Sequence, residues 1–272
     1  MAVVFTQAGE VIALENMVNN TAPQTLILRL YTNNQTPTAL DTTSNYTELS
    51  GYGYSAVTLV PSSFSFTAGT PCTATYPTIS FNFTGAAGYI YGYYVTQASS
   101  GQLMYANRFS NAPIQIANNG DQIRVSMTLQ MQNSTSGGST VVFTQTGEVV
   151  ALENIVNNTA PQNLTLRLYS NNYTPTSTDT SSNYTELSGY GYSSVSLTPS
   201  SFTFATGTPC TATYPQITFT FTGAAGLIYG YFVTQASSGS LLFANRFSNA
   251  PISIANNGDQ IRVTLTLQLA NQ

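Results

Sequence analysis

The side chains that could do chemistry in this 272-residue chain are almost all carboxylates. There are ten acidic residues and six basic ones, all arginines, and the chain has no histidine, lysine or tryptophan. Without histidine there is no Ser-His-Asp or Cys-His couple and no histidine-ligated zinc, and without lysine there is no Schiff base. What remains is the chemistry of paired carboxylates, in which two carboxyl groups act across one sugar, as in glycosidases.

The spacing of the carboxylates does not support an acid and base pair. Glu10 and Glu15 suit the start of a helix and a pairing with an arginine. The Asn119-Gly120-Asp121 run offers one carboxylate, whereas calcium takes six to eight oxygen ligands, so we expect a turn capped by its own aspartate. We therefore predict no catalytic residue, no metal ligand and no cofactor. The carboxylates considered in the first half are Glu10, Glu15, Asp41, Glu48 and Asp121.

Composition narrows the class of protein further. Charged residues make up 6% of the chain, hydrophobic ones 42% and aromatic ones 12%, which suits a packed core rather than a disordered segment. A scattered net charge of −4 argues against a nucleic-acid partner, which needs a basic surface. No apolar run approaches the ~20 residues that cross a bilayer, and the N-terminal residues do not resemble a secretory signal. We expect synthesis in the cytoplasm and no membrane partner.

The chain is a tandem duplication. The phrase VVFTQ at Val3 returns at Val141, and the same offset of 138 residues holds to the end without an insertion or deletion. Between the copies lies NSTSGGST, a stretch with the composition of a flexible linker. We predict one domain over residues 1–132, a linker over 133–140 and a second domain over 141–272, a pair of linked sites that would bind with avidity.

Differences between the copies indicate which faces of the strands are wet. In LILRLY from Leu26, the leucines are kept and Ile27 becomes Thr165, so the leucine face is expected to point inward. Similar alternation predicts antiparallel strands separated by turn signals. The fold class expected is all-β, a tandem pair of antiparallel β-sandwich, jelly-roll-like domains, each with one short helix at residues 10–18 or its counterpart. The predicted strands of copy 1 are residues 2–6, 26–31, 55–60, 63–67, 79–83, 89–96, 102–110, 114–117 and 123–130.

Each copy has one cysteine, Cys72 or Cys210, in the same phrase TPCTATYP. A disulfide within one copy is therefore impossible, and we expect two thiols outside any disulfide, in preference to an intermolecular bridge.

Tyrosines beside glycines are the strongest candidates for a binding surface. The Gly51-Tyr52-Gly53-Tyr54 turn offers aromatic, hydrogen-bonding faces, whereas Tyr91 and Tyr93 fit ordinary strand packing. With nearby asparagines, these tyrosines could form a shallow platform for a glycan or a contact for a protein, and the residues do not decide between the two. The predicted contact residues are Asn33, Asn34, Tyr52 and Tyr54, with Asn171, Asn172, Tyr190 and Tyr192 in the second copy.

Several phrases occur in an order that resembles a known group of proteins. They are TLILRLYTNNQTP at residues 25–37, YTELSGYGY at 46–54, the aromatic strand at 79–84, GQLMYA at 101–106 and NGDQIRV at 119–125. This order is similar to that of small β-rich virion proteins of tailed bacteriophages, often described as tail-fibre or capsid-decorating proteins. The resemblance implies a structural role on the head or the tail of a phage particle and supplies no catalytic residues. By analogy with that group it also implies a homo-oligomer, such as a trimer.

The function that we predict is therefore that of a non-enzymatic virion protein that decorates or cements the capsid surface. Its expected partners are the major capsid protein or other virion proteins, and its expected location is the virion. The alternative is a tail or head-fibre adhesin that binds host glycan through the turns at residues 51–54. A third hypothesis is an enzyme that cleaves polysaccharide.

Overall fold

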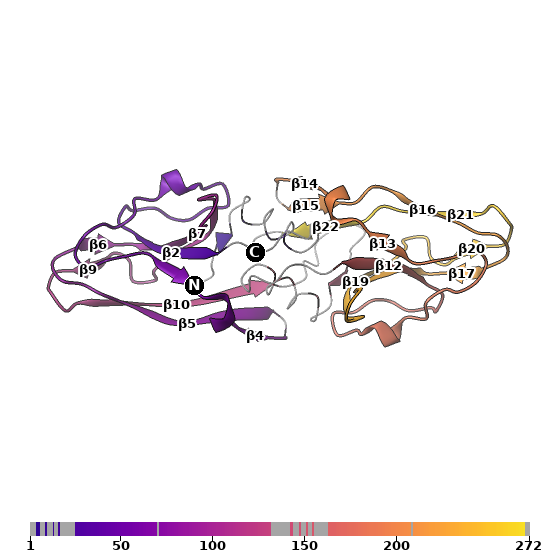
Figure 1. The fold of residues 1–272 in the computed structure, drawn as a ribbon, viewed down its shortest axis with the longest axis horizontal. Helices are drawn as coiled ribbons and strands as arrows, with labels where there is room; N and C mark the ends of the chain where they lie inside the picture. Colours follow the sequence, from indigo (N-terminus) through magenta and orange to yellow (C-terminus); the bar gives the residue numbers. More distant parts are fainter. Residues whose placement is uncertain are drawn as a thin grey trace.

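The computed structural model describes residues 4–5, 9, 13, 16, 25–69, 71–131, 142–143, 147, 151, 154, 163–207 and 209–269. Within them the chain is all-β, with antiparallel sheets and no helix of seven or more residues, which confirms the expected sandwich class. The two copies lie end to end, with β6 and β9 of copy 1 at one extreme and β17 and β20 of copy 2 at the other (Figure 1).

Copy 1 is built from two sheets and one short strand pair. The larger sheet has the order β1-β8-β7-β2-β3, the smaller one has the order β10-β5-β4, and β6 pairs with β9. The strands are β1 (Val4–Phe5), β2 (Leu26–Tyr31), β3 (Val57–Leu59), β4 (Ser65–Thr67), β5 (Cys72–Asn82), β6 (Gly88–Ile90), β7 (Gly92–Gln97), β8 (Leu103–Arg108), β9 (Ile114–Ile116) and β10 (Gln122–Met131), with 3-10 turns η1 (Thr43–Asn45) and η2 (Pro61–Ser63).

Copy 2 repeats this plan, with its counterparts of the long strands β5 and β10 each divided in two. Its larger sheet has the order β11-β19-β18-β12-β13, and the shorter sheets are β14-β15-β22, β16-β21 and β17-β20. The elements are β11 (Val142–Phe143), β12 (Leu164–Tyr169), η3 (Ser181–Asn183), β13 (Val195–Leu197), η4 (Pro199–Ser201), β14 (Thr203–Ala205), β15 (Cys210–Thr213), β16 (Ile217–Thr220), β17 (Gly226–Ile228), β18 (Gly230–Gln235), β19 (Leu241–Arg246), β20 (Ile252–Ile254), β21 (Gln260–Val263) and β22 (Thr266–Leu269).

The alternation of apolar and polar residues predicts the buried face of β2 and β10 correctly, whereas β7 is buried on both faces. The leucines of β2 are buried, as are Ile123, Val125, Met127 and Leu129 of β10, while Arg124 and the other polar residues of β10 are exposed. The outward face of β2 is drier than the exchange of Ile27 for Thr165 suggests, because Thr165 is itself buried. Its cross-strand neighbours are Ser196 and Thr234, on the strands at either side.

The single strand expected over residues 89–96 is in fact two strands in two different sheets. β6 pairs with β9, and after Tyr91 the chain continues as β7 between β2 and β8. The main chain of Tyr91 marks the change of partner, since its N–H donates to Tyr31 (3.0 Å) and its carbonyl accepts from Phe109 (2.9 Å). β5 also differs from expectation, because it begins at Cys72, seven residues before the predicted start at 79.

Two predictions fall largely outside the described residues. The linker at 133–140 lies outside them, as do Glu10, Val11, Leu14, Glu15, Met17 and Val18 of the predicted helix. Gly9, Ala13 and Asn16 are described, and all three are helical and buried, as are Gly147, Ala151 and Asn154 in copy 2. Their spacing of four and three residues is the spacing expected for one face of a helix.

The cysteines meet the sequence-based expectation. Cys72 and Cys210 are both buried and lie outside any disulfide. The sulfur of each lies 3.3 to 3.4 Å from a glycine carbonyl oxygen three residues before it. The two thiols are packing groups of the core.

Candidate functional site: the outer tip of each copy

The Gly51-Tyr52-Gly53 turn has a backbone conformation that a tyrosine rarely adopts. Its three successive φ angles are positive, 78°, 53° and 75°, and the matching turn of copy 2 has φ 52° at Tyr190. Glycine tolerates this region, but a residue with a Cβ is strained there by about 1 kcal/mol or more. The tyrosine is kept in both copies in spite of that strain.

Main-chain hydrogen bonds hold the turn against two neighbouring loops. The N–H of Thr84 donates to the carbonyl of Tyr52 (2.9 Å), and Phe83 and Gly120 bond the 83–88 loop to the 117–121 turn. The Tyr52 ring lies next to Gly85, where an added Cβ would be 3.4 Å from its Cδ1. We call this assembly of residues 51–54, 83–89 and 117–121 the tip, together with its counterpart at 189–192, 221–227 and 255–259 in copy 2. It adjoins β6 and β9, at the outer end of the sandwich (Figure 1).

Exposed apolar side chains are retained at the tip and lost elsewhere. Among the described residues of copy 1, the exposed large hydrophobic residues are Leu40, Tyr52, Val60 and Tyr89. In copy 2, Leu40 and Val60 are replaced by Thr178 and Thr198. The two tip positions keep large side chains, Tyr190 and Leu227. The tip side chains remain 45% to 52% exposed in both copies. The duplication thus separates the tip from apolar residues that are free to change.

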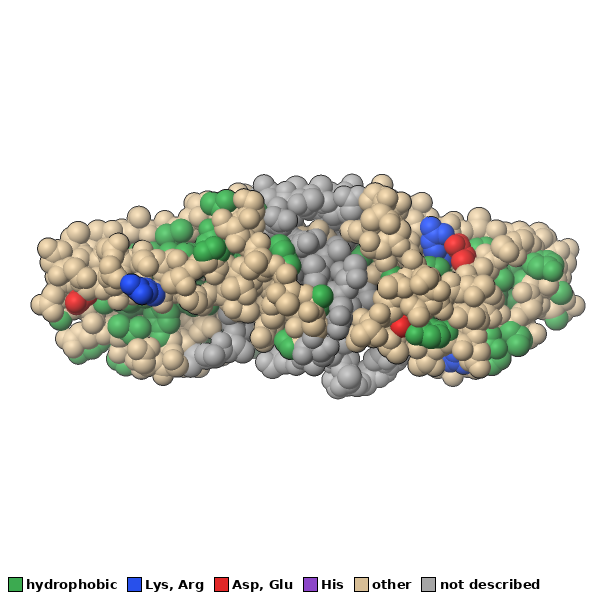
Figure 2. Space-filling view, turned by 90° about the horizontal axis from the view of Figure 1, so that it is seen from below, with side chains coloured by type: hydrophobic (Ala, Val, Ile, Leu, Met, Phe, Trp, Pro, Cys, Tyr) green, Lys and Arg blue, Asp and Glu red, His purple; other side chains and the backbone are tan. Residues whose placement is uncertain are grey.

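The tip presents almost no charge. Among its described residues the one ionisable group besides tyrosine is Asp121, whose Oδ2 accepts from the N–H groups of Ala117 (2.8 Å) and Asn118 (2.9 Å). This confirms the turn expected for Asn119-Gly120-Asp121. On the face of the molecule in Figure 2, blue and red side chains are few and scattered, while hydrophobic side chains reach both outer ends.

The predicted asparagines serve the fold. Asn33 donates to the carbonyl of Asn45 (2.8 Å) and accepts from the N–H of Thr47 (2.8 Å), so it ties the segment after β2 to residues 45–47, next to the isolated β-bridge between Tyr31 and Glu48. Asn34 accepts a hydrogen bond from Arg108 (2.7 Å). Asn171 and Asn172 repeat these contacts in copy 2. The amide oxygens that would have contacted a ligand are therefore engaged within the protein.

Tyr54 is also a structural residue. Its hydroxyl accepts from the N–H of Leu30 (3.0 Å) and donates to Glu48 (3.1 Å), and its ring packs 5.7 Å from that of Phe81. Burial raises the pKa of Tyr54 well above its ordinary value, and the same is true of Tyr192. Of the four residue positions predicted for contact, Tyr52 with its counterpart Tyr190 presents the exposed aromatic ring.

A buried carboxylate network lies beside β2, and its significance was not recognised from the sequence. Asp41 is buried and accepts from the Tyr46 hydroxyl (2.6 Å), the Thr38 hydroxyl (2.8 Å) and the Gln35 amide (3.1 Å). Burial alone would raise the pKa of Asp41, but these donors outweigh it and hold the pKa below the ordinary value. The spacing of Thr38 and Asp41, three residues apart, is the local signal that could have indicated such a turn.

In copy 2 the same aspartate keeps its donors through a different side chain. Tyr173, which stands where copy 1 has Gln35, donates to Asp179 (2.7 Å) beside the bonds from Thr176 and Tyr184. The pKa of Asp179 is likewise held low by its hydrogen bonds, against the effect of burial. Both copies thus supply a side-chain donor to this aspartate from the same position, Gln35 in copy 1 and Tyr173 in copy 2, which indicates that the fold needs the hydrogen bond.

The remaining described carboxylate of copy 1 is also engaged. Glu48 bonds Arg29 (2.6 Å) as well as Tyr54, and Glu186 does the same with Arg167 (2.6 Å). Glu10 and Glu15 lie outside the described residues. In the part of the chain that the structure describes, no group of three or more acidic or cysteine side chains could hold a metal ion, and no helix is long and apolar enough to cross a membrane.

Comparison with known proteins identifies no relative. No family model, no curated protein and no solved structure matches the chain.

Proposed function

We propose that this protein is a non-enzymatic structural component of a bacteriophage virion, which decorates or cements the capsid surface through the tips of its two copies. The partner is the major capsid protein or another virion protein that repeats on a lattice. The tip's exposed side chains are the contact residues, Tyr52 and Tyr89 in copy 1 and Tyr190 and Leu227 in copy 2.

The observation that carries this proposal is the retention of exposed apolar groups at the tip while Leu40 and Val60 have become threonine in copy 2. Large apolar side chains that stay exposed and clustered with small residues are typical of protein contact surfaces, where aromatic anchors provide most of the binding energy. The near absence of charge at the tip suits the centre of an interface, which is depleted of charged residues.

A protein partner fits the tip better than a sugar. A glycan platform relies on aromatic rings for stacking and on side-chain amides and hydroxyls for orientation. At the tip, Tyr89 of copy 1 is replaced by the non-aromatic Leu227 in copy 2. The asparagines predicted as polar contacts, Asn33 and Asn34, lie outside the tip and are engaged in the fold. A leucine serves as an anchor in a protein contact but offers no face for stacking.

The test mixes the purified protein with phage particles that lack it and measures co-sedimentation and the resistance of the particles to heat. The variant Tyr52→Asn with Tyr190→Asn removes both rings and keeps a residue that tolerates positive φ. We expect it to fold and to lose binding and protection. The matched control is Leu40→Thr with Val60→Thr, which removes exposed apolar groups that copy 2 lacks, and should bind like the original chain. Binding that survives the tip variant, or that is lost equally in the control, would contradict the proposed contact.

A second candidate function is that of an adhesin on a tail or head fibre that binds host glycan. The half-exposed rings of Tyr52 and Tyr190 favour it, since an aromatic face beside small residues also accommodates a sugar. In the same set of variants, adsorption to host cells that is lost in the tip variant, with no binding to particles, would replace the first proposal by this one.

A further inference from the structure

The hydrophobic core does not stop at the boundary between the copies. One cluster of buried hydrophobic side chains contains residues of both copies, from Leu26 through Leu129 to Leu267. β10 runs from the outer end of copy 1 toward copy 2, and β22 runs toward copy 1 (Figure 1).

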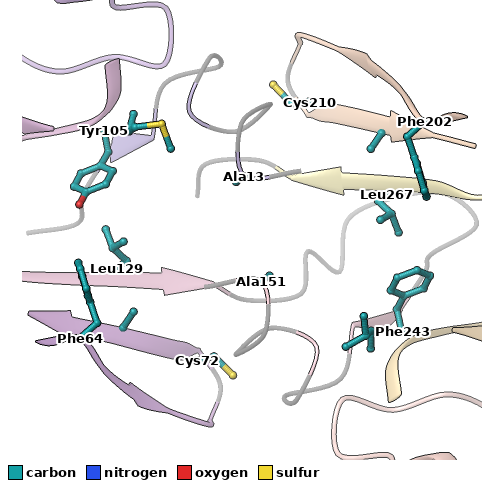
Figure 3. Close-up of a cluster of buried hydrophobic side chains, with 14 of the residues drawn as sticks. Ala13, Phe64, Cys72, Tyr105, Leu129, Ala151, Phe202, Cys210, Phe243 and Leu267 are labelled. Atoms are coloured by element: carbon teal, nitrogen blue, oxygen red, sulfur yellow. The ribbon is translucent and has the colours of Figure 1, made fainter. Parts of the chain in front are cut away.

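Side chains at the inner ends are closed off from solvent. Cys72 at the start of β5 and Leu129 near the end of β10 have no exposed surface, and the same holds for their counterparts Cys210 and Leu267. In the close-up of the cluster, these four residues surround the centre of the molecule from both sides (Figure 3). Apolar surface of this kind is stabilising only when another apolar surface covers it.

Two alanines lie where the copies meet. Figure 3 draws Ala13, of copy 1, by the end of β22 on the side of Cys210, and Ala151, of copy 2, by the end of β10 on the side of Cys72. Both alanines are fully buried and belong to the shared cluster. Four residues before Ala13, Gly9 packs so tightly on the Met104 backbone of its own copy that a Cβ would overlap the Met104 carbonyl, which ties Gly9 to copy 1.

We infer that the inner end of each sandwich is an interaction surface whose partner is the other copy, so that the chain folds and unfolds as one body. Each copy completes the core of the other, with Ala13 on the side of copy 2 and Ala151 on the side of copy 1. The two tips are thereby held at opposite ends of one unit, where two domains on a flexible linker would leave their separation free. This inference concerns folding and goes beyond the proposed function.

The chain carries its own reporters for a test, one buried thiol in each copy. The full-length protein is incubated in increasing urea with a thiol-alkylating reagent, and labelling at Cys72 and at Cys210 is read separately by mass spectrometry of peptides. Leu129→Ala removes core volume in copy 1, and Leu267→Ala is its exact counterpart in copy 2. We expect both thiols to become reactive at one urea midpoint, and each variant to lower that midpoint at both thiols by the same amount.

Independent domains would give a different pattern. Leu129→Ala would then shift labelling at Cys72 alone, and Leu267→Ala would shift Cys210 alone, which would overturn the inference. If either alanine variant fails to fold, the milder pair Ile123→Val and Ile261→Val gives the same comparison with a smaller loss of buried volume. No particle enters this experiment, so its failure leaves the proposed capsid contact untouched, and failure of particle binding leaves the shared core untouched.

Discussion

Several described ionisable residues of this protein stabilise its fold. Asp41 is enclosed by hydroxyl and amide donors, and Glu48 joins Arg29 to Tyr54. Arg108 bonds Asn34 and the Gln35 carbonyl while its guanidinium lies 5.1 Å from the centre of the Tyr91 ring. A chain with so few charges uses them at long-range junctions, where one charged group satisfies several partners. Tyr52 is the opposite case, because about half of its side chain is exposed to solvent.

The aspartate network predicts a specific dependence of stability on pH. The folded pKa of Asp41 and Asp179 lies below the unfolded value, so their contribution to the free energy of unfolding is complete above about pH 4 and is lost as the pH falls through the folded pKa. Asp41→Asn with Asp179→Asn should cost about 1–3 kcal/mol per copy at neutral pH and flatten the decline below about pH 4. Urea unfolding at a series of pH values measures both effects.

A second pair of variants checks the cause. Tyr46→Phe with Tyr184→Phe keeps each carboxylate but removes its 2.6 Å donor, so the acid-induced loss of stability should move to higher pH. An unchanged acid limb in both pairs of variants would show that these aspartates do not govern the response.

At the scale of elements, the change of partner between β6 and β7 shapes the sandwich. The chain leaves β9 and enters the large sheet between β2 and β8 within two residues, Tyr91 and Gly92. At Gly92 an added Cβ would overlap the Asn107 carbonyl and would lie 2.6 Å from the Tyr31 hydroxyl. Glycine is therefore required for close approach here, and its counterpart Gly230 has the same surroundings.

Substitution at Gly92 should separate close packing from backbone strain. We expect Gly92→Ala to lower the free energy of unfolding by about 3 kcal/mol or more, because the overlapping atoms are backbone and a packed tyrosine. Gly88→Ala is the matched control four residues earlier, where φ is 83° and nothing lies within 4 Å, so its cost should be the strain alone, about 1 kcal/mol. Equal losses of stability in the two variants, measured by urea unfolding, would argue against the close approach.

The whole molecule carries the same apolar tip twice, at opposite ends of one elongated body (Figure 1). A single tip with two half-exposed side chains is far smaller than the interface of about 1,200 Å² or more that a stable complex needs. Two tips that engage one lattice together gain affinity by avidity, with the gain depending on how well their separation matches the lattice. The proposed function thus depends on both copies acting at once.

Loss of one tip should therefore weaken binding almost as much as loss of both. Tyr52→Asn alone and Tyr190→Asn alone should each weaken apparent affinity for particles by about 10²-fold or more, and the double variant should abolish binding. Because the tips are nearly uncharged, affinity should change little between about 0.05 and 0.5 M salt. Titration of depleted particles with labelled protein measures each value. A single-tip variant that binds as tightly as the original chain would rule out two-point attachment.

Much of the local structure is predictable from the residues alone. The bounds of β2 and the inward faces of β2 and β10 follow from alternation, because side chains of a strand point to opposite sides in turn. The turn at Asp121 and the presence of a turn at residues 51–54 follow from their asparagine, aspartate and glycine residues, whereas the positive φ of Tyr52 does not follow from its residue type.

Only part of the predicted contact site depends on residues that are neighbours in the sequence. The turn that exposes Tyr52 is predictable from its flanking glycines. Asn33, Asn34 and Tyr54 instead bond within the fold to partners up to 74 residues away, Arg108 among them. No local pattern reveals such partners, since they meet only when the sheet forms.

The sequence by itself determined the duplication, the all-β class, the loss of histidine and lysine chemistry, and the strand faces, since all of these depend on residue type and near neighbours. Tertiary structure decided the rest. It decided which sheet the residues on each side of Tyr91 enter, that Asp41 is buried among several hydrogen-bond donors, that Leu227 and Tyr190 are both exposed, and that Cys72 and Cys210 lie in one continuous core. The physical reason is that burial and hydrogen bonding are shared among segments distant in the chain, so their outcome depends on how the elements pack together.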